Sequence, residues 1–211
     1  MPKPSPLLII MLLLIAAFIG LRNEQRIFEA RGTFSIKQTP GAVILVWTDP
    51  VEAPMADRLA AAFREWQSKT DKFVIDLNSP GGAVTEGGLV IDEINAMKRT
   101  HKVETLVRAG RQCLSMCVPI FLAGDERRAA LSSRWMFHEP VAVDSITDEE
   151  VQEPDWKRRR SGRKFIEEHF VSSPMDTAWR EKLSKEWVDR EVWKSGNDLY
   201  AENSGIITRL E

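Results

Sequence analysis

The chain contains few of the residues that bind metals or form disulfides, and it has almost no excess charge. Its 211 residues include two cysteines, three histidines and one tyrosine, and 29 basic residues nearly balance 31 acidic ones. Two cysteines cannot form a disulfide framework, and the histidines have no ligand-like spacing with them, so we expect neither a metal nor a cofactor. A net charge of −2 provides no phosphate-neutralising surface, which argues against nucleic acid as a partner.

What is present is the composition of a globular protein. Hydrophobic residues make up 43% and charged residues 28% of the chain. These values exclude a wholly disordered or collagen-like chain. From Arg26 onward no low-complexity linker or repeat interrupts the sequence, so we expect one domain over residues 26–211.

An unbroken apolar run, Leu7–Leu21, stands near the amino terminus and indicates a membrane anchor or an export signal. Its residues would span roughly 22 Å as a helix, short of the roughly 30 Å hydrocarbon core, which suits the apolar part of a signal peptide. No small-x-small cleavage site follows the run, which favours an uncleaved anchor. We therefore expect residues 1–25 to form a hydrophobic targeting helix, and the domain to lie on the extracytoplasmic side of a membrane.

Apolar runs alternate with helical patterns along the domain. Buried strands are predicted at 42–47, 72–77 and 103–107, with an amphipathic helix through Leu59, Phe63 and Trp66 and another at 84–99 between them. This order predicts a parallel sheet with helical crossovers. Further along we expect an apolar helix from near Ser115 to Ala123, a short strand at 135–137, and helices near 153–170 and 176–188. The pattern indicates an α/β fold throughout.

Three segments carry groups that could perform chemistry, each beyond a predicted strand or at a helix start, where sites form in open α/β sheets. The turn at 78–82 (NSPGG) contains consecutive glycines, which can expose backbone amides. Ser115 lies at the predicted start of the apolar helix, and His138 ends the short strand. Taken singly, each has a structural alternative: a ligand-free turn, a helix N-cap or a structural histidine. Together they offer the nucleophile, base and oxyanion donors of acyl transfer.

The stretches VIDLNSPGGAVTEGG, AGRQCLSMCVPIFLAG and SRWMFHEP resemble the proteolytic subunit of the Clp protease, within the ClpP/crotonase superfamily. The resemblance runs from about residue 71 to residue 208, with the elements in the same order. It implies stacked ββα units, Ser115 as nucleophile, His138 as general base, and the amides of Gly82 and Met116 as the oxyanion hole. It also implies a peptide or protein substrate and a homo-oligomer, because the superfamily stacks its protomers into trimers or rings.

A third catalytic residue would orient the imidazole and stabilise its charged form. In the family an Asp follows the last long helix, and here the corresponding region offers Asp189 and Glu191. Ungapped counting back from Lys194 and Ser195 lands on Glu191, whereas residue type favours Asp189. We choose Asp189; the two positions would share a strand face.

Two cysteines, Cys113 and Cys117, bracket Ser115 where the family commonly has small residues. Outside the cytoplasm such thiols can oxidise. Positions i and i+4 of a helix are too far apart for a disulfide, so a bridge requires Cys113 to lie before the helix proper. Buried free thiols are the alternative.

These features predict a serine peptidase with a Ser115, His138 and Asp189 triad. ATP-independent action is expected, because the amino-terminal segment takes the place of the family's gating segment. One alternative is a serine–lysine enzyme like the signal-peptide peptidases with Lys185 as base, against which His138 argues. A crotonase-type acyl-CoA enzyme would leave Ser115 and His138 without a role. A non-catalytic scaffold, on which Ser115 is only a helix cap, is the remaining alternative.

Overall fold

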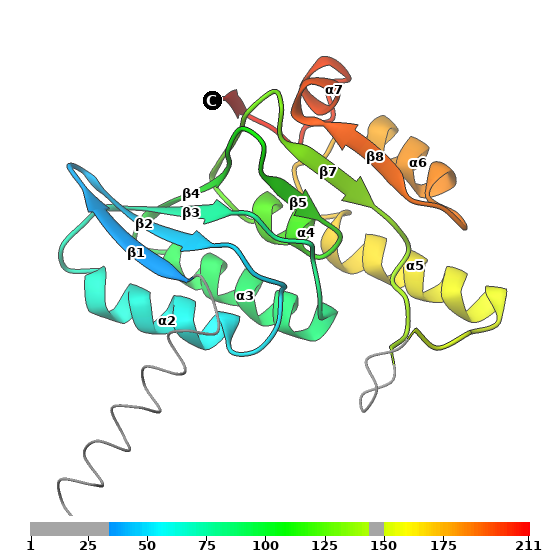
Figure 1. Ribbon diagram of the computed structural model, residues 1–211, viewed down its shortest axis with the longest axis horizontal. Helices are drawn as coiled ribbons and strands as arrows, with labels where there is room; N and C mark the ends of the chain where they lie inside the picture. The colour runs from blue at the N-terminus through cyan, green and yellow to red at the C-terminus, as the bar shows by residue number, and fades with distance from the viewer. Residues whose placement is uncertain (1–33, 144–149) are drawn as a thin grey trace, which may run out of the picture.

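A computed structural model describes residues 34–143 and 150–211 of the chain (Figure 1). The predicted hydrophobic helix at residues 1–25 lies outside the described residues, as does the expected domain boundary at residue 26. Within the described part, no helix combines the length and apolar character needed to cross a membrane.

Six strands form the larger sheet, in the order β1-β2-β3-β4-β6-β9. Their bounds are β1 (Ser35–Thr39), β2 (Ala42–Trp47), β3 (Lys72–Leu77), β4 (Lys102–Val107), β6 (Glu126–Ala129) and β9 (Arg209–Leu210). The pair β1–β2 is antiparallel, and all the remaining neighbouring pairs of this sheet are parallel. The predicted sheet with parallel strands is therefore confirmed, and β2 and β3 have the predicted bounds.

Three short strands form a second sheet, in the order β5-β7-β8. Their bounds are β5 (Gln112–Leu114), β7 (Arg134–Phe137) and β8 (Val192–Ser195). The pairing of β7 is parallel with β5 and antiparallel with β8. In Figure 1 this sheet lies beside the carboxyl ends of β2 and β3, and an isolated bridge between Ser79 and Cys113 joins the two sheets there.

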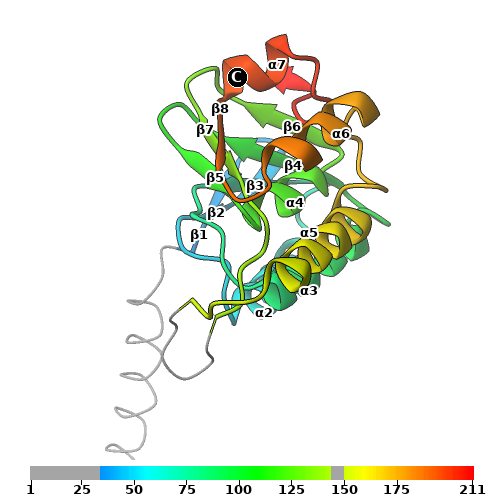
Figure 2. The same ribbon diagram turned by 90° about the vertical axis from the view of Figure 1, so that its right-hand side faces the viewer.

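The helices are α2 (Met55–Trp66), α3 (Val84–Met97), α4 (Cys117–Leu122), α5 (Asp155–His169), α6 (Thr177–Glu186) and α7 (Gly196–Ala201). Both α2 and α3 pack side by side under the larger sheet, and α4 contacts α3 and β4 (Figure 2). The predicted helices are confirmed within a few residues at their ends, except that α4 begins at Cys117 rather than near Ser115.

The core lies between the larger sheet and α2, α3 and α4. Residues 73–77 of β3 are all buried, as expected for a parallel strand covered on both faces. The helix α3 contributes Val90, Ile94 and Met97, which are fully buried at spacings of three and four residues. This packing fixes the carboxyl end of β3, from which the NSPGG turn begins.

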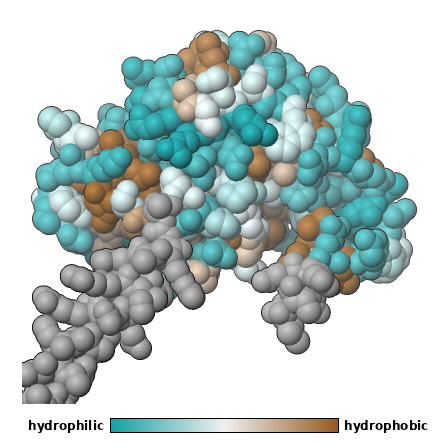
Figure 3. Space-filling view, in the orientation of Figure 1, coloured by the Kyte–Doolittle hydropathy of each residue, from teal (hydrophilic) through white to brown (hydrophobic). Residues whose placement is uncertain are grey.

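On the face seen in Figure 3, hydrophilic residues separate several small apolar areas. Single exposed apolar side chains are common on soluble domains and need no special explanation. Leu131, in the turn between β6 and β7, is an exposed apolar side chain of this kind, with 49% of its surface exposed.

We expect Leu45→Ala to lower the free energy of unfolding by about 2–5 kcal/mol, because Leu45 is completely buried in β2 and its loss leaves a cavity. Denaturant unfolding followed by circular dichroism measures this change. Leu131→Ala is the matched control and should change the same quantity by about 0.5 kcal/mol or less. Equal losses in the two variants would show that β2 is not part of the core.

Candidate active site

Ser115 lies in the turn between β5 and α4, with a positive φ of 51°. Its amide donates a hydrogen bond to the Met136 carbonyl of β7 (2.9 Å), and α4 begins two residues later at Cys117. Ser115 is therefore neither helical nor the N-cap, which corrects the expected helix start. A positive φ is uncommon for a residue other than glycine. A strained strand-to-helix turn of this kind exposes the nucleophile in α/β-hydrolases.

A disulfide joins Cys113 and Cys117 across this turn. Cys113 belongs to β5 and therefore lies before α4. A disulfide between the two cysteines requires this position, as expected from the sequence. Both residues are completely buried. The structure thus contains the bridge and not the alternative pair of free thiols.

His138 follows β7 directly, and its Nε2 lies 2.8 Å from Ser115 Oγ. The pairing of β5 with β7 explains the contact, because Leu114 lies opposite Met136 and the chain therefore brings Ser115 to the end of β7. The two side chains that the sequence predicts as nucleophile and base are brought together at hydrogen-bond distance. In this arrangement a neutral imidazole can accept the hydroxyl proton through Nε2.

Burial holds the pKa of His138 below its ordinary value of 6.5, because a less polar environment disfavours the imidazolium. The negative charges of Glu191 and Glu150, and a hydrogen bond with the backbone of Glu139, raise this pKa and offset only part of the effect. His138 is therefore neutral near pH 7, which is the protonation state that a general base requires.

The structure does not bring Asp189 to His138. The Asp189 carboxylate forms ion pairs with Arg158 and Arg159 of α5. It is not among the groups that shift the pKa of His138. Asp189 has a φ of 60° and precedes β8, so it does not share a strand face with Glu191, contrary to our expectation.

Glu191 lies directly before β8, and β8 pairs with β7, the strand that His138 follows. The register ends with Phe137 opposite Val192, and His138 and Glu191 are the next residues on each side, just beyond the two strands. The charge of Glu191 is also the largest of the effects that raise the pKa of His138. Trp193 Nε1 donates a hydrogen bond to Glu191 Oε2 (2.8 Å). The strand register and the effect on the pKa of His138 therefore favour Glu191 over Asp189 as the carboxylate that acts on the imidazole.

The NSPGG turn lies against the Ser115 turn. Gly81 has a φ of 91°, and a Cβ at this position would lie 2.7 Å from both the Leu114 carbonyl oxygen and Ser115 Cβ, so only glycine permits this approach. Within the described residues, neither the Gly82 amide nor the Met116 amide donates a hydrogen bond. Met116 follows Ser115 in the chain, and Gly82 follows the glycine that packs against Ser115, so both amides belong to segments that meet at the Ser115 turn.

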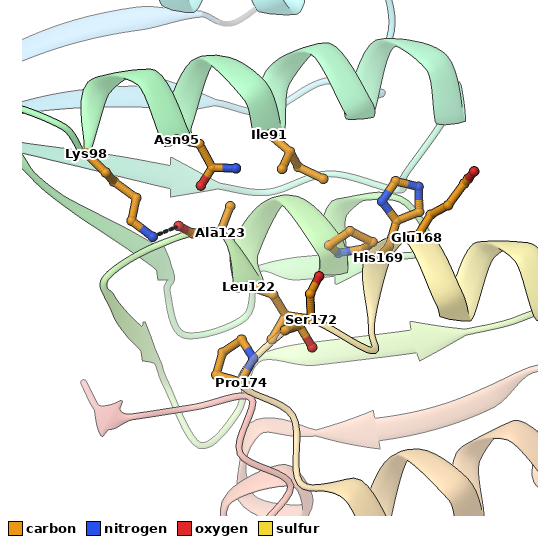
Figure 4. Close-up of a pocket in the computed structure, with 11 residues that line it drawn as sticks. Ile91, Asn95, Lys98, Leu122, Ala123, Glu168, His169, Ser172 and Pro174 are labelled. Atoms are coloured by element: carbon orange, nitrogen blue, oxygen red, sulfur yellow. Dashed lines mark hydrogen bonds between the residues drawn. The ribbon is translucent and has the colours of Figure 1, made fainter.

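A separate hollow of about 190 Å³ lies between α3, α4 and the end of α5 (Figure 4). His169 lines it, and burial lowers the pKa of this histidine. Neither Ser115 nor His138 borders the hollow, so it is distinct from the site described above. Nowhere in residues 34–143 and 150–211 do three metal-binding side chains gather.

The model of the Clp protease family matches residues 34–209, and the chain belongs to this family. It is 29% identical over 138 residues to the ATP-dependent Clp protease proteolytic subunit 1 of Protochlamydia amoebophila, covering 64% of this chain and 62% of that protein. It is 28% identical over 100 residues to the corresponding subunit of Streptococcus mutans, covering 46% of this chain and 50% of that one. The matches thus span only about half to three-fifths of these relatives.

Among solved structures, the chain resembles a mutant of ClpP1 from Listeria monocytogenes. The TM-score is 0.58 at 21% identity, over 80% of this chain and 90% of that one. At this identity the likeness concerns the fold, and it confirms the ClpP-like architecture expected from the sequence.

NMR titration of the histidine rings should give His138 a pKa below 6.5, and Glu191→Gln should lower it further, because a negative charge that favours the imidazolium is removed. Asp189→Asn is the matched control and should have little effect, since Arg158 already pairs with that carboxylate. The chain has only three histidines, so His138→Ala assigns the signal. A larger shift in Asp189→Asn than in Glu191→Gln would restore Asp189 as the neighbour of the imidazole.

Proposed function

We propose that the chain is a serine peptidase that cleaves peptide or protein substrates. The observation that carries the proposal is the 2.8 Å separation between Ser115 Oγ and His138 Nε2. The amides of Gly82 and Met116, in the two turns that meet at Ser115, have no acceptor in the described part of the chain. Membership of the Clp protease family supports the same reaction. No metal or cofactor is needed for it.

In the proposed reaction Ser115 Oγ attacks the carbonyl carbon of the scissile bond while His138 Nε2 takes the hydroxyl proton. The amides of Gly82 and Met116 stabilise the negative charge that develops on the carbonyl oxygen. His138 then gives its proton to the departing amine, and water releases the acyl group in a second step of the same kind.

Glu191 is our proposal for the carboxylate that orients His138 and stabilises its charged form, in place of Asp189. The strand register and the effect of Glu191 on the pKa of His138 support this role. A carboxylate that acts in this way changes the rate without touching the substrate.

The alternative enzymes receive less support. Lys185, the base of a serine–lysine mechanism, is exposed on α6, whereas the hydrogen-bond partner of Ser115 Oγ is His138. A crotonase-type acyl-CoA enzyme would use the oxyanion hole alone and would leave this hydroxyl–imidazole pair without a function.

We propose that the enzyme acts outside the cytoplasm, without an ATPase, and as a homo-oligomer. The apolar run at 7–21 supports the location, and so does the Cys113–Cys117 disulfide, because such bridges persist in oxidising compartments. The same amino-terminal segment supports membrane association and ATP-independent action. The proposed assembly follows from membership of the Clp protease family.

A fluorophosphonate probe should label the purified full-length protein in detergent, in buffer without ATP, because the probe reacts with activated serines. Ser115→Ala and His138→Ala should abolish labelling. Ser184→Ala is the matched control and should label like the wild type, since Ser184 Oγ only donates to the Glu181 carbonyl of its own helix.

The same experiment separates the alternatives. Labelling that survives His138→Ala but is lost in Lys185→Ala would favour the serine–lysine mechanism. Absence of labelling in a folded, oligomeric wild type would favour the non-catalytic scaffold. Labelling that requires ATP and a Clp ATPase would contradict the proposed ATP-independent action.

A reporter enzyme that is active only outside the cytoplasm, fused after Glu211, should be active in cells. The physical reason is that residues 7–21 would direct the following domain across the membrane. The control is the same fusion without residues 1–25, which should be inactive. Activity of a reporter that works only in the cytoplasm would contradict the proposed location.

A further inference from the structure

We propose that the Cys113–Cys117 disulfide positions the nucleophile, so that full peptidase activity requires the oxidised form of the two cysteines. This inference rests on the proposed function and deepens it. Cys113 and Cys117 are positioning residues in this proposal, since they act through Ser115 and Met116 and touch no substrate.

The bridge encloses the reacting groups themselves. Between the two cysteines lie only Leu114, Ser115 and Met116, which include the proposed nucleophile and one of the two oxyanion amides. The Cα atoms of the cysteines are 5.1 Å apart, whereas an extended segment of this length would separate them by about 13 Å. The covalent bond therefore excludes the open conformations of the turn.

The turn also needs an external constraint. Ser115 has a positive φ, a conformation that persists in a non-glycine residue only where the surroundings enforce it. The Ser115 amide is held by the Met136 carbonyl, but the Met116 amide has no acceptor among residues 34–143 and 150–211. The Met116 side chain packs against Gly87 of α3, where a Cβ would lie 2.4 Å from it. The disulfide adds the constraint that acts on both ends of the turn.

Cys113 connects three parts of the site. It lies opposite Trp135 in β7, the strand that carries the base, and it forms an isolated bridge with Ser79 of the NSPGG turn. Its sulfur is bonded to Cys117, the first residue of α4. Through this one residue, the base strand, the oxyanion turn and the helix after the nucleophile are tied together.

The bridge should stabilise the whole domain less than a disulfide that closes a long loop would. A disulfide stabilises a fold mainly by restricting the unfolded chain, and this effect is smallest for short loops. Here the sequence separation is only four residues. Its principal effect is therefore local, at the turn that carries Ser115.

The bond forms by thiol–disulfide exchange with a disulfide oxidant. One cysteine thiolate attacks the oxidant and releases its first thiol, and the second cysteine then attacks the mixed disulfide and releases the other. The two protein thiols are oxidised and the oxidant is reduced to two thiols. Both cysteines are fully buried, so the finished bond is protected from reductants in the folded protein.

The test compares the full-length protein with its cysteines oxidised, the same protein refolded and kept with excess dithiol, and the Cys113→Ala/Cys117→Ala variant. Without the bridge, the fluorophosphonate labelling rate should fall on the order of ten- to a hundredfold, because a misplacement of about 1 Å costs that much. The loss should appear in the rate of the covalent step rather than in probe binding. Refolding the reduced protein with oxidised glutathione in place of the dithiol should restore labelling.

Leu45→Ala is the control for a merely structural role, since it lowers stability far from the Ser115 turn. It should keep the labelling rate of the wild type, and circular dichroism should show that the bridge-free proteins are folded. Thiol alkylation verifies the redox state of each sample.

The outcomes separate this inference from the proposed function. If the oxidised wild type is not labelled, the proposed function fails and this inference fails with it. If the oxidised and bridge-free proteins are labelled at equal rates, the positioning role alone is overturned. Failure of both bridge-free proteins to fold would also overturn it, because the bridge would then serve the whole domain.

Discussion

The pairing of β7 with both of its neighbours is the constraint on which the site depends. Its parallel pairing with β5 brings Ser115 to the end of β7, and its antiparallel pairing with β8 brings the segment that contains Glu191 to the same end. Successive side chains of a strand point to opposite faces, so a slip of one residue would replace His138 by Phe137 or Glu139. The three-stranded sheet is small, but its register determines which groups meet.

The central strands β2, β3 and β4 of the larger sheet could be predicted because they are its longest runs of mainly apolar residues. β2 consists of six apolar residues and β3 has four apolar residues out of six, and the helices that follow them have clear periodicity. The strands β5, β6 and β8 have only three or four residues, and β6 is a charged sequence, ERRA. Such segments have no pattern of their own and are strands only because neighbouring strands pair with them.

The groups nearest Ser115 could also be predicted, since each belongs to a motif with its own local signal. The glycines of NSPGG are one such signal, and His138, two residues before Pro140, is another. The sequence alone could not decide between Asp189 and Glu191, because residue type and ungapped counting disagreed and the β7–β8 register, which favours Glu191, is a property of the fold. The paired arginines of α5 that hold Asp189 come from a part of the sequence with no local link to it.

Burial of His138 has two effects on its imidazole, and both suit the general base that we propose. Loss of solvent lowers the pKa of the imidazole, which keeps it neutral and able to take a proton from Ser115. Once the proton has moved, the same low polarity strengthens the attraction between the imidazolium and a nearby carboxylate. Glu191 therefore has its largest effect on the charged form of His138, which at neutral pH would be populated mainly after proton transfer. In the proposed mechanism the carboxylate of Glu191 would thus affect the reaction rate more than the stability of the resting protein.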